Sequence, residues 1–148
     1  MMPPPAADLY LENQLCFALY ASSLAMGKAY RPLLAELGLT YPQYVVMMAL
    51  WQHGEMTMGG LGEAVALDSG TLSPLLRKLM VQTLVLRTRS AQDDRSVLIK
   101  LTSAGRALRR RAHAVHAQVA CSTGRSAQQR QTLLNQLHQL RAGLLSTR

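Results

Sequence analysis

Residues 57–81 read TMGGLGEAVALDSGTLSPLLRKLMV, and two short helices can each begin in this stretch at a capping side chain. Thr57 can cap the first helix, which carries Leu61 and Val65 at helical spacing. Asp68 can cap the second, whose leucines recur at the same spacing before a pair of basic residues. Two short helices joined by a few residues, the second followed by basic side chains, form a helix-turn-helix pattern.

A short hairpin is expected directly after this pattern. Residues 84–89 and 96–102 have the composition and alternation of strands, and the polar segment 90–95 joins them. A hairpin in this place is typical of a wing. The sequence therefore predicts a winged helix-turn-helix with a two-stranded wing.

Longer helices are expected before this region. Apolar side chains recur along residues 15–37 at intervals of three, four or seven, as on one face of a helix that Gly38 ends. Thr40 with Gln43 forms a capping box for the next helix, which should run to about Gln52.

Two further helices are expected after the hairpin. One can begin at Thr102 or Ser103 and end at Gly124, and the last follows a capping box of Ser126 and Gln129. The apolar stripes of the terminal helices lie far from the wing in sequence. A bundle of terminal helices from two subunits would bury them.

The expected fold class is therefore mainly α with a small β-wing, a winged helix-turn-helix whose terminal helices form a homodimer bundle. The single chain 1–148 would divide into dimerisation helices at 1–38 and 103–148 and a DNA-binding region at 39–102. Such a dimer suits a palindromic DNA site, because it presents two recognition helices about one DNA turn apart.

The charge distribution indicates a polyanionic partner. The 148 residues carry 16 Lys and Arg against 8 Asp and Glu, a net charge of +8. Residues 1–67 carry five acids and two bases, whereas residues 68–148 carry fourteen bases and three acids. DNA or RNA is favoured over an acidic membrane surface, because alanines and histidines rather than aromatic anchors flank the basic run 106–111.

Several other classes of protein are not expected. Two cysteines cannot form the disulfide scaffold of a small secreted domain, and no apolar run approaches the ~18 residues of a membrane span. The start of the chain lacks the features of a signal peptide, so we expect a soluble, cytoplasmic protein. Glycine-rich phosphate loops, carboxylate pairs and nucleophile elbows are missing from the sequence, and His113 with His116 lacks further metal ligands. Neither an enzyme, a cofactor nor a metal site is expected.

The sequence resembles a known family. Residues 68–79 are similar to the recognition helix of the MarR family of winged helix-turn-helix regulators, and residues 84–105 to its wing and next helix. Residues 15–20, 30–34 and 37–44 are similar to the OhrR group of that family, the organic-hydroperoxide-sensing repressors. Two residues depart from general expectation: Thr83 stands where the family usually has glycine, and Pro74 lies inside the predicted helix, as it does in OhrR-like sequences.

The resemblance implies a redox sensor at Cys16. A thiolate attacks a peroxide oxygen far faster than a thiol does, and a second thiol can convert the resulting sulfenic acid to a disulfide. In the two-cysteine OhrR subgroup, Cys121 of the other chain would be that resolving thiol. The side chains expected to stabilise the thiolate or to line an apolar approach are Phe17, Leu19, Tyr20, Tyr30 and Tyr41. In the family, tyrosines at positions 30 and 41 come from the partner subunit.

The resemblance also implies which residues contact operator DNA. Short hydroxyls can reach base edges or phosphates, and basic side chains suit the backbone. An Asp-x-Arg pattern in the wing, here Asp93 and Arg95, would orient an arginine into the minor groove. The expected contact residues are Ser69, Thr71, Ser73, Arg77, Lys78, Arg87, Arg89, Asp93 and Arg95. The run 106–111 either adds phosphate contacts or is a solvated helix face.

Three functions stay open at this point. The predicted one is a homodimeric repressor that leaves palindromic operator DNA when an organic hydroperoxide oxidises Cys16. In the second, a reversibly bound phenolic ligand relieves a MarR-type regulator, and the cysteines are incidental small core residues. The third is a basic thiol peroxidase.

Overall fold

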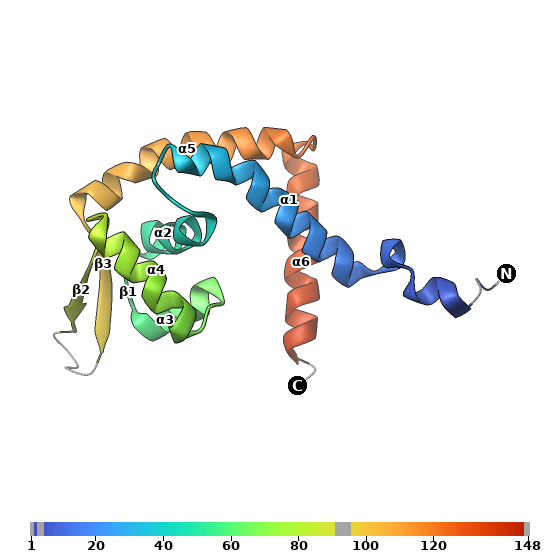
Figure 1. Ribbon diagram of the computed structural model, residues 1–148, viewed down its shortest axis with the longest axis horizontal. Coiled ribbons are helices and arrows are strands. Elements are labelled where there is room, and N and C mark those ends of the chain that lie inside the picture. Colours follow the sequence, from blue (N-terminus) through green and yellow to red (C-terminus); the bar gives the residue numbers. More distant parts are fainter. Residues whose placement is uncertain (1, 3–4, 91–95, 147–148) are drawn as a thin grey trace. The chain divides into compact units, whose positions relative to one another are not determined.

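The fold is mainly helical with one small sheet. The computed structural model describes residue 2, residues 5–90 and residues 96–146. In chain order the elements are two 3-10 helices, η1 (Pro5–Leu9) and η2 (Leu11–Asn13), then α1 (Leu15–Ala35), α2 (Tyr41–His53), β1 (Glu55–Thr57), α3 (Met58–Val65), α4 (Ser69–Val81), β2 (Val85–Arg89), β3 (Val97–Leu101), α5 (Ser103–Ser122) and α6 (Ala127–Ser146) (Figure 1). This order confirms the predicted helix-turn-helix, α3–α4, followed by a hairpin.

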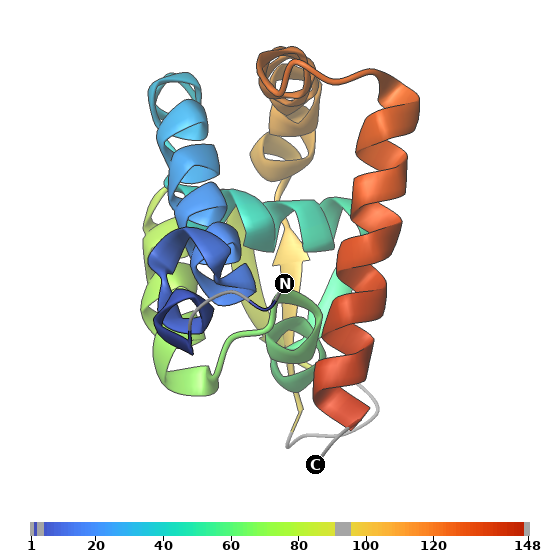
Figure 2. The ribbon, with the colours of Figure 1, turned by 90° about the vertical axis from the view of Figure 1, so that its right-hand side faces the viewer.

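The chain forms two compact units. The first comprises residues 1–115 and contains the helix-turn-helix, the sheet and the first turns of α5. The second comprises residues 116–148 and contains the end of α5 and all of α6. Figure 2 shows the ribbon from a second direction.

The helices begin at the predicted caps. The Thr40 hydroxyl accepts from the Gln43 backbone N–H at 3.4 Å, and the Gln43 side chain accepts from the Thr40 N–H at 2.9 Å. The Asp68 carboxylate accepts from the backbone N–H of Thr71 at 2.7 Å, which caps α4. These caps are confirmed because each uses residues three apart, which the local sequence determines.

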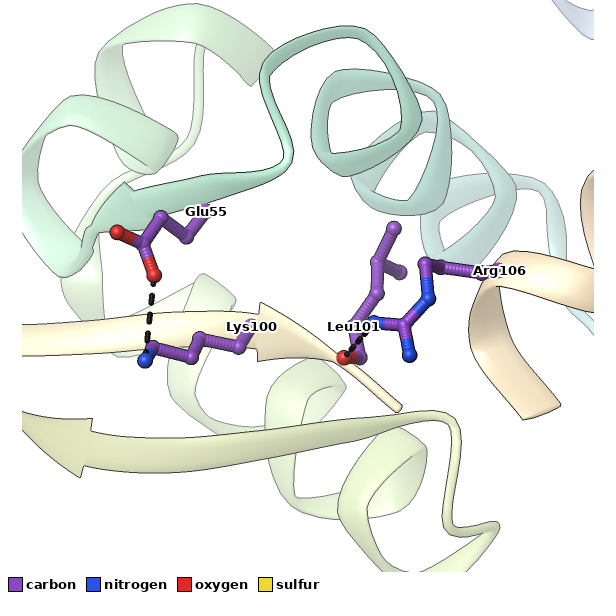
Figure 3. A network of polar contacts seen from close by, with 4 residues as sticks. All are labelled: Glu55, Lys100, Leu101 and Arg106. Atoms are coloured by element: carbon purple, nitrogen blue, oxygen red, sulfur yellow. Dashed lines mark hydrogen bonds and ion pairs between the residues drawn. The ribbon is translucent and has the colours of Figure 1, made fainter. Parts of the chain in front are cut away.

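The sheet has a third strand that the sequence did not indicate. Its order is β1-β3-β2, with antiparallel pairs throughout, so the prediction of a two-stranded wing was wrong. Three residues are too few to show strand alternation, and pairing with β3 determines their conformation. Glu55 faces Lys100 across this pair, and its carboxylate lies 3.3 Å from the Lys100 Nζ (Figure 3).

The core of the first unit joins α1, the helix-turn-helix, the sheet and α5. Its fully buried side chains include Leu34, Met47, Leu50, Leu61, Leu72, Leu76, Leu79 and Ile99. Leu108, Ala112 and Val115 of α5 join the same cluster, as their helical spacing predicts. Figure 1 shows α2 between α5 on one side and α3 and α4 on the other.

One helix end differs from the prediction, and the turn after α4 forms without glycine, as the sequence requires. Helix α1 ends at Ala35 rather than at Gly38, which adopts a φ of 73° in the turn that follows. Thr83 adopts a left-handed φ of 59° after α4, where the family usually has glycine. Its carbonyl accepts from the Thr102 hydroxyl at 2.6 Å. Pro74 lies inside α4 and does not break the helix.

Candidate functional site

Helix α4 presents a polar face next to the wing. Leu72, Leu76 and Leu79 are buried on its inner side. Of the predicted DNA contacts on α4, Ser69, Thr71, Arg77 and Lys78 are exposed and Ser73 is half-buried. The hydrogen bond from the Thr71 backbone lowers the pKa of Asp68, so this N-terminal cap is a carboxylate at neutral pH.

The fold brings basic residues of α4 and of the wing together. Ser73 and Arg77 of α4 line one shallow hollow with Arg87 of β2. Arg89, two residues further along β2, is exposed as well. Because side chains two apart on a strand point to the same face, Arg87 and Arg89 extend one basic surface. Asp93 and Arg95, which were predicted to contact DNA, lie outside the described residues.

The basic run on α5 faces away from this surface. A ridge of exposed side chains along α5 consists of Arg106, Arg109, Arg110 and His113. The opposite side of α5 is buried in the core that α4 also faces, and α2 lies between the two helices in Figure 1. The exposed faces of α4 and α5 therefore point in different directions.

Two arginines of the run, Arg106 and Arg111, bond to backbone carbonyls of neighbouring elements. The Arg106 guanidinium donates to the Leu101 carbonyl at 3.0 Å, which ties the start of α5 to the end of β3 (Figure 3). Arg111 donates to the Glu36 carbonyl at 2.9 Å, just after the end of α1. Both bonds stabilise the junction between the sheet and the long helices.

Cys16 lies in the first turn of α1, exposed and in the free thiol form. Phe17 and Tyr20 beside it are 37% and 62% exposed in the single chain, and Leu19 is half-buried. Cys16 is thus exposed in the single chain and has apolar side chains beside it.

Tyr30 cannot reach Cys16 of its own chain. Both residues belong to the continuous helix α1, and fourteen residues at a rise of 1.5 Å separate their Cα atoms by about 21 Å. The Tyr41 ring packs 5.2 Å from that of Tyr30, at the same distant end of α1. A phenol at either position can therefore meet only the Cys16 of another chain.

The tyrosine end of α1 contains two aromatic residues that the sequence reasoning missed. The Tyr44 ring lies 5.3 Å from Tyr30 and 6.4 Å from Tyr41. Tyr44 also packs edge-on against Trp51 of the same helix at 6.3 Å, and the Trp51 indole N–H donates to the Gly105 carbonyl at 2.8 Å. The signal was available in the spacing, because positions 41, 44 and 51 recur at three and seven along one helix.

The phenols of this cluster retain their protons at neutral pH. Burial raises the pKa of Tyr30 to about 12, with smaller contributions from Tyr44 and Tyr41. Burial also raises the pKa of Tyr44, although its hydrogen bond with Tyr30 acts in the opposite direction. Both hydroxyls are therefore hydrogen-bond donors under ordinary conditions.

Cys121 lies near the end of α5 in the second unit, exposed and also free. The described ranges contain no group of three or more His, Cys, Asp or Glu that could hold a metal ion. In those same ranges, none of the helices has the length and apolar character that crossing a membrane requires.

Comparison with known proteins identifies relatives of this architecture. A family model described as transcriptional regulator SarA/Rot matches residues 28–111. The organic hydroperoxide resistance transcriptional regulator of Bacillus subtilis (strain 168) is 53% identical over 102 residues, which cover 69% of each chain. These relatives are regulators of transcription.

Solved structures of AbfR, a protein of Staphylococcus epidermidis, share the fold. Overoxidized AbfR bound to DNA superposes with a TM-score of 0.75 at 29% identity, over 95% of this chain and 99% of AbfR. Disulfide-formed AbfR superposes with a TM-score of 0.64 at 30% identity, over 92% of each chain. The winged helix-turn-helix expectation is confirmed by these likenesses.

Proposed function

The chain belongs to the MarR/SarA family of winged helix-turn-helix transcriptional regulators, and we propose that it is a repressor that releases operator DNA when an organic hydroperoxide oxidises Cys16. The family regulates transcription and does not consist of enzymes, which sets the thiol peroxidase alternative aside. The observation that carries the proposal is a free, exposed cysteine in the first turn of α1. It is supported by the similarity of the chain to a regulator that is named for hydroperoxide resistance. A regulator that binds DNA would be located in the cytoplasm.

The functional molecule in this proposal is a homodimer. Helix α1 leaves Leu15, Leu24 and Met26 exposed, at 61%, 51% and 40%. Helix α6 has no buried residue in the described chain, and its exposed leucines include Leu137 and Leu144. Unburied apolar stripes of this length support a second copy as their partner, with 1–38 and 103–148 as the dimerisation helices. The same copy would bring Tyr30 and Tyr41 to the Cys16 that their own chain holds out of reach.

Operator DNA in this proposal meets α4 and the wing. The exposed residues Ser69, Thr71, Arg77 and Lys78 would contact base edges and phosphates, together with Ser73 at the edge of the hollow. Arg87 and Arg89 would extend the contact along the wing, and Asp93 with Arg95 would complete it at the turn. The E. coli regulator MarR, 23% identical, has been crystallised with operator DNA, and its likeness supports the fold of this surface.

The chemistry of release begins with the Cys16 thiolate. Its sulfur forms an S–O bond with a peroxide oxygen while the O–O bond breaks, so the sulfur is oxidised to a sulfenic acid and the peroxide is reduced to an alcohol. The Cys121 thiolate of the partner subunit then attacks the sulfenic sulfur, and hydroxide leaves as water after taking up a proton. The product is a disulfide between the two subunits.

The disulfide, rather than oxidation alone, is the releasing event in this proposal. AbfR in its overoxidized form is described as bound to DNA, and a separate structure of AbfR contains the disulfide. An equilibrium that moves from nearly full to nearly empty occupancy needs a bias of about 5.5 kcal/mol. A covalent crosslink between two recognition units can supply such a bias, because it excludes dimer shapes that fit the operator.

A gel-shift assay tests this function. The probe is a DNA fragment selected from a random pool by the reduced protein, and the treatment is one equivalent of cumene hydroperoxide per subunit. Wild type should release the probe and Cys16→Ser should keep it, because a serine hydroxyl has no sulfur for the hydroperoxide to oxidise. Release of the probe from Cys16→Ser, or release by salicylate with no response to hydroperoxide, would favour a ligand-relieved regulator.

A further inference from the structure

The α5 ridge is a straight row of basic side chains in the first unit. Arg106, Arg109, Arg110 and His113 are exposed, and their spacing of three and four residues places them on one face of the helix. Along the helix axis the row extends for about 10 Å, at a rise of 1.5 Å per residue. Three fixed positive charges in a line match an extended polyanion better than a small anion.

The charges of the ridge are not neutralised within the chain. Helix α5 contains neither Asp nor Glu. In the part of the chain that the structure describes, Arg109 and Arg110 form no ion pair and no side-chain hydrogen bond, and Arg106 donates only to uncharged oxygens. Like charges three and four residues apart on a helix repel each other. A bound polyanion would remove this repulsion.

The ridge does not face the surface that is proposed to bind the operator. Leu108 and Ala112, on the inner side of α5, belong to the same core as Leu72 and Leu76 of α4. Helix α2 lies between α5 and α4 (Figure 1). A duplex that contacts α4 and the wing is therefore separated from the ridge by the core of the unit. DNA at the ridge would have to be a second segment of duplex.

The composition of the ridge favours nucleic acid over a protein or a membrane. Ala107 is the apolar residue that lines the hollow along it, and the larger apolar side chains of α5, Leu108, Val115 and Val119, are buried. Protein interfaces depend on apolar and aromatic anchors, and membrane-surface helices on an apolar face. Phosphate groups need only the charge and the forked N–H donors that arginine supplies.

We propose that the α5 ridge binds the phosphate backbone of a second segment of duplex DNA while α4 and the wing hold the operator. The protein then connects two DNA segments, one recognised by its sequence and the other bound by charge. This inference rests on the proposed contact of α4 with the operator, and it does not depend on the oxidation of Cys16.

A bead assay with two DNA fragments tests this inference. A short operator, selected from a random pool, is immobilised on beads and saturated with the reduced protein, and unbound protein is washed away. A fluorescent duplex of unrelated sequence is then added, and its affinity for the loaded beads is measured. That affinity should fall about tenfold between 50 and 200 mM salt, because contacts of Arg109 and Arg110 with two phosphates give a slope of about −1.8.

The double variant Arg109→Ala with Arg110→Ala identifies the surface. Both side chains are exposed and alanine is favourable in a helix, so the variant should fold and bind the operator as wild type does. Its affinity for the second duplex should be about tenfold lower at 50 mM salt. Arg125→Ala with Arg141→Ala is the matched control, because it removes the same charge from exposed positions outside α5. The control should retain the second duplex as wild type does.

Four results would overturn the inference. Wild-type retention by the ridge variant would mean that the ridge is a solvated face, and an equal loss in the control would mean that total charge alone attracts the duplex. Weaker operator binding by the ridge variant would mean that a single duplex reaches both surfaces. Stronger retention of a polyglutamate peptide than of the duplex would assign the ridge to an acidic protein. Failure of the wild-type protein to select any operator would instead refute the proposed function, together with the inference that rests on it.

Discussion

Tyr30 is a half-buried phenol whose hydrogen the proposed sensor uses, and its environment keeps that hydrogen bound. Burial raises the pKa of Tyr30 from 10.0 to about 12 and raises that of Tyr44 as well. Such a phenol can donate a hydrogen bond to a neighbouring thiolate at every pH at which the phenol keeps its proton.

This environment predicts a loss of stability in base. Between pH 10 and about 12 the unfolded chain has ionised Tyr30 while the folded protein retains the proton. The unfolded state then binds fewer protons, so the contribution of Tyr30 is complete below pH 10 and is lost as the pH rises toward 12. Urea unfolding from pH 8 to 11.5 checks this, and Tyr30→Phe should show a shallower loss than wild type. Parallel pH curves for the two proteins would contradict it.

Single residues were predictable where their partners are close in sequence. Thr40, Thr57 and Asp68 cap helices as expected, because each accepts from a backbone N–H three residues on. Tyr44 was missed because it packs against Tyr30, which lies on a different helix. Sequence spacing shows that a tyrosine is on a helical face, but it does not show which side chain the face meets.

Among the elements, α3, α4 and the hairpin were predicted, and β1 was not. Strand β1 has three residues, and it is defined by its pairing with β3, more than forty residues further along the chain. Helix α1 was extended too far because Leu37 fits the helical apolar spacing although it lies in the turn after Ala35. The first error arises because pairing with a segment distant in sequence defines the strand. The second arises because local bonds close the helix early: the N–H groups of Leu37 and Leu39 both donate to the Leu34 carbonyl.

The junction of α5 with the wing depends on a residue without a side chain. A Cβ at Gly105 would lie 2.1 Å from the Leu84 carbonyl oxygen, well inside van der Waals contact. The same oxygen accepts from the Thr102 backbone N–H at 3.1 Å, so it cannot move freely. Close approach of the two backbones therefore requires glycine here.

Gly105→Ala should destabilise the protein by about 1–3 kcal/mol, as overpacking of a tight core site does. Gly59→Ala is the matched control, because no atom lies within 4 Å of its Cβ position in α3. That variant should leave the free energy of unfolding unchanged or raise it by up to about 1 kcal/mol, because alanine favours a helix more than glycine does. Chemical denaturation of both variants measures the difference, and equal stabilities would show that the junction tolerates a methyl group.

Across the molecule, positive charge lies on two surfaces with different orientations. Arg77 and Arg87 share the hollow between α4 and the wing, whereas Arg110 belongs to the α5 ridge on the other side of the core. The sequence predicted that the second half of the chain is basic. It could not show that the basic residues form two separate surfaces, because the buried side of each helix decides which way its arginines face. The assembly of the sensor from two chains was expected from family resemblance, and the span of α1 gives it a physical reason.

The salt dependence of DNA binding distinguishes the two basic surfaces. Arg77→Ala should reduce the slope of log affinity against log salt by about 1.8, since a dimer loses two phosphate contacts. Arg110→Ala should leave the slope unchanged, because the ridge faces away from α4. Fluorescence anisotropy between 50 and 200 mM salt measures both slopes. An equal decrease for both variants would mean that the operator also reaches α5.

We propose that a disulfide between Cys16 and the partner's Cys121 removes the protein from its operator. The most direct measurement follows both quantities in one titration with organic hydroperoxide: crosslinked dimer on a non-reducing gel, and bound DNA by anisotropy. We expect the fraction of bound DNA to fall in proportion to the fraction of crosslinked dimer, and a thiol reductant to restore binding. Cys121→Ser should neither form the crosslink nor release the DNA. Full release of DNA without a crosslink, or a crosslinked dimer that still binds its operator, would contradict it.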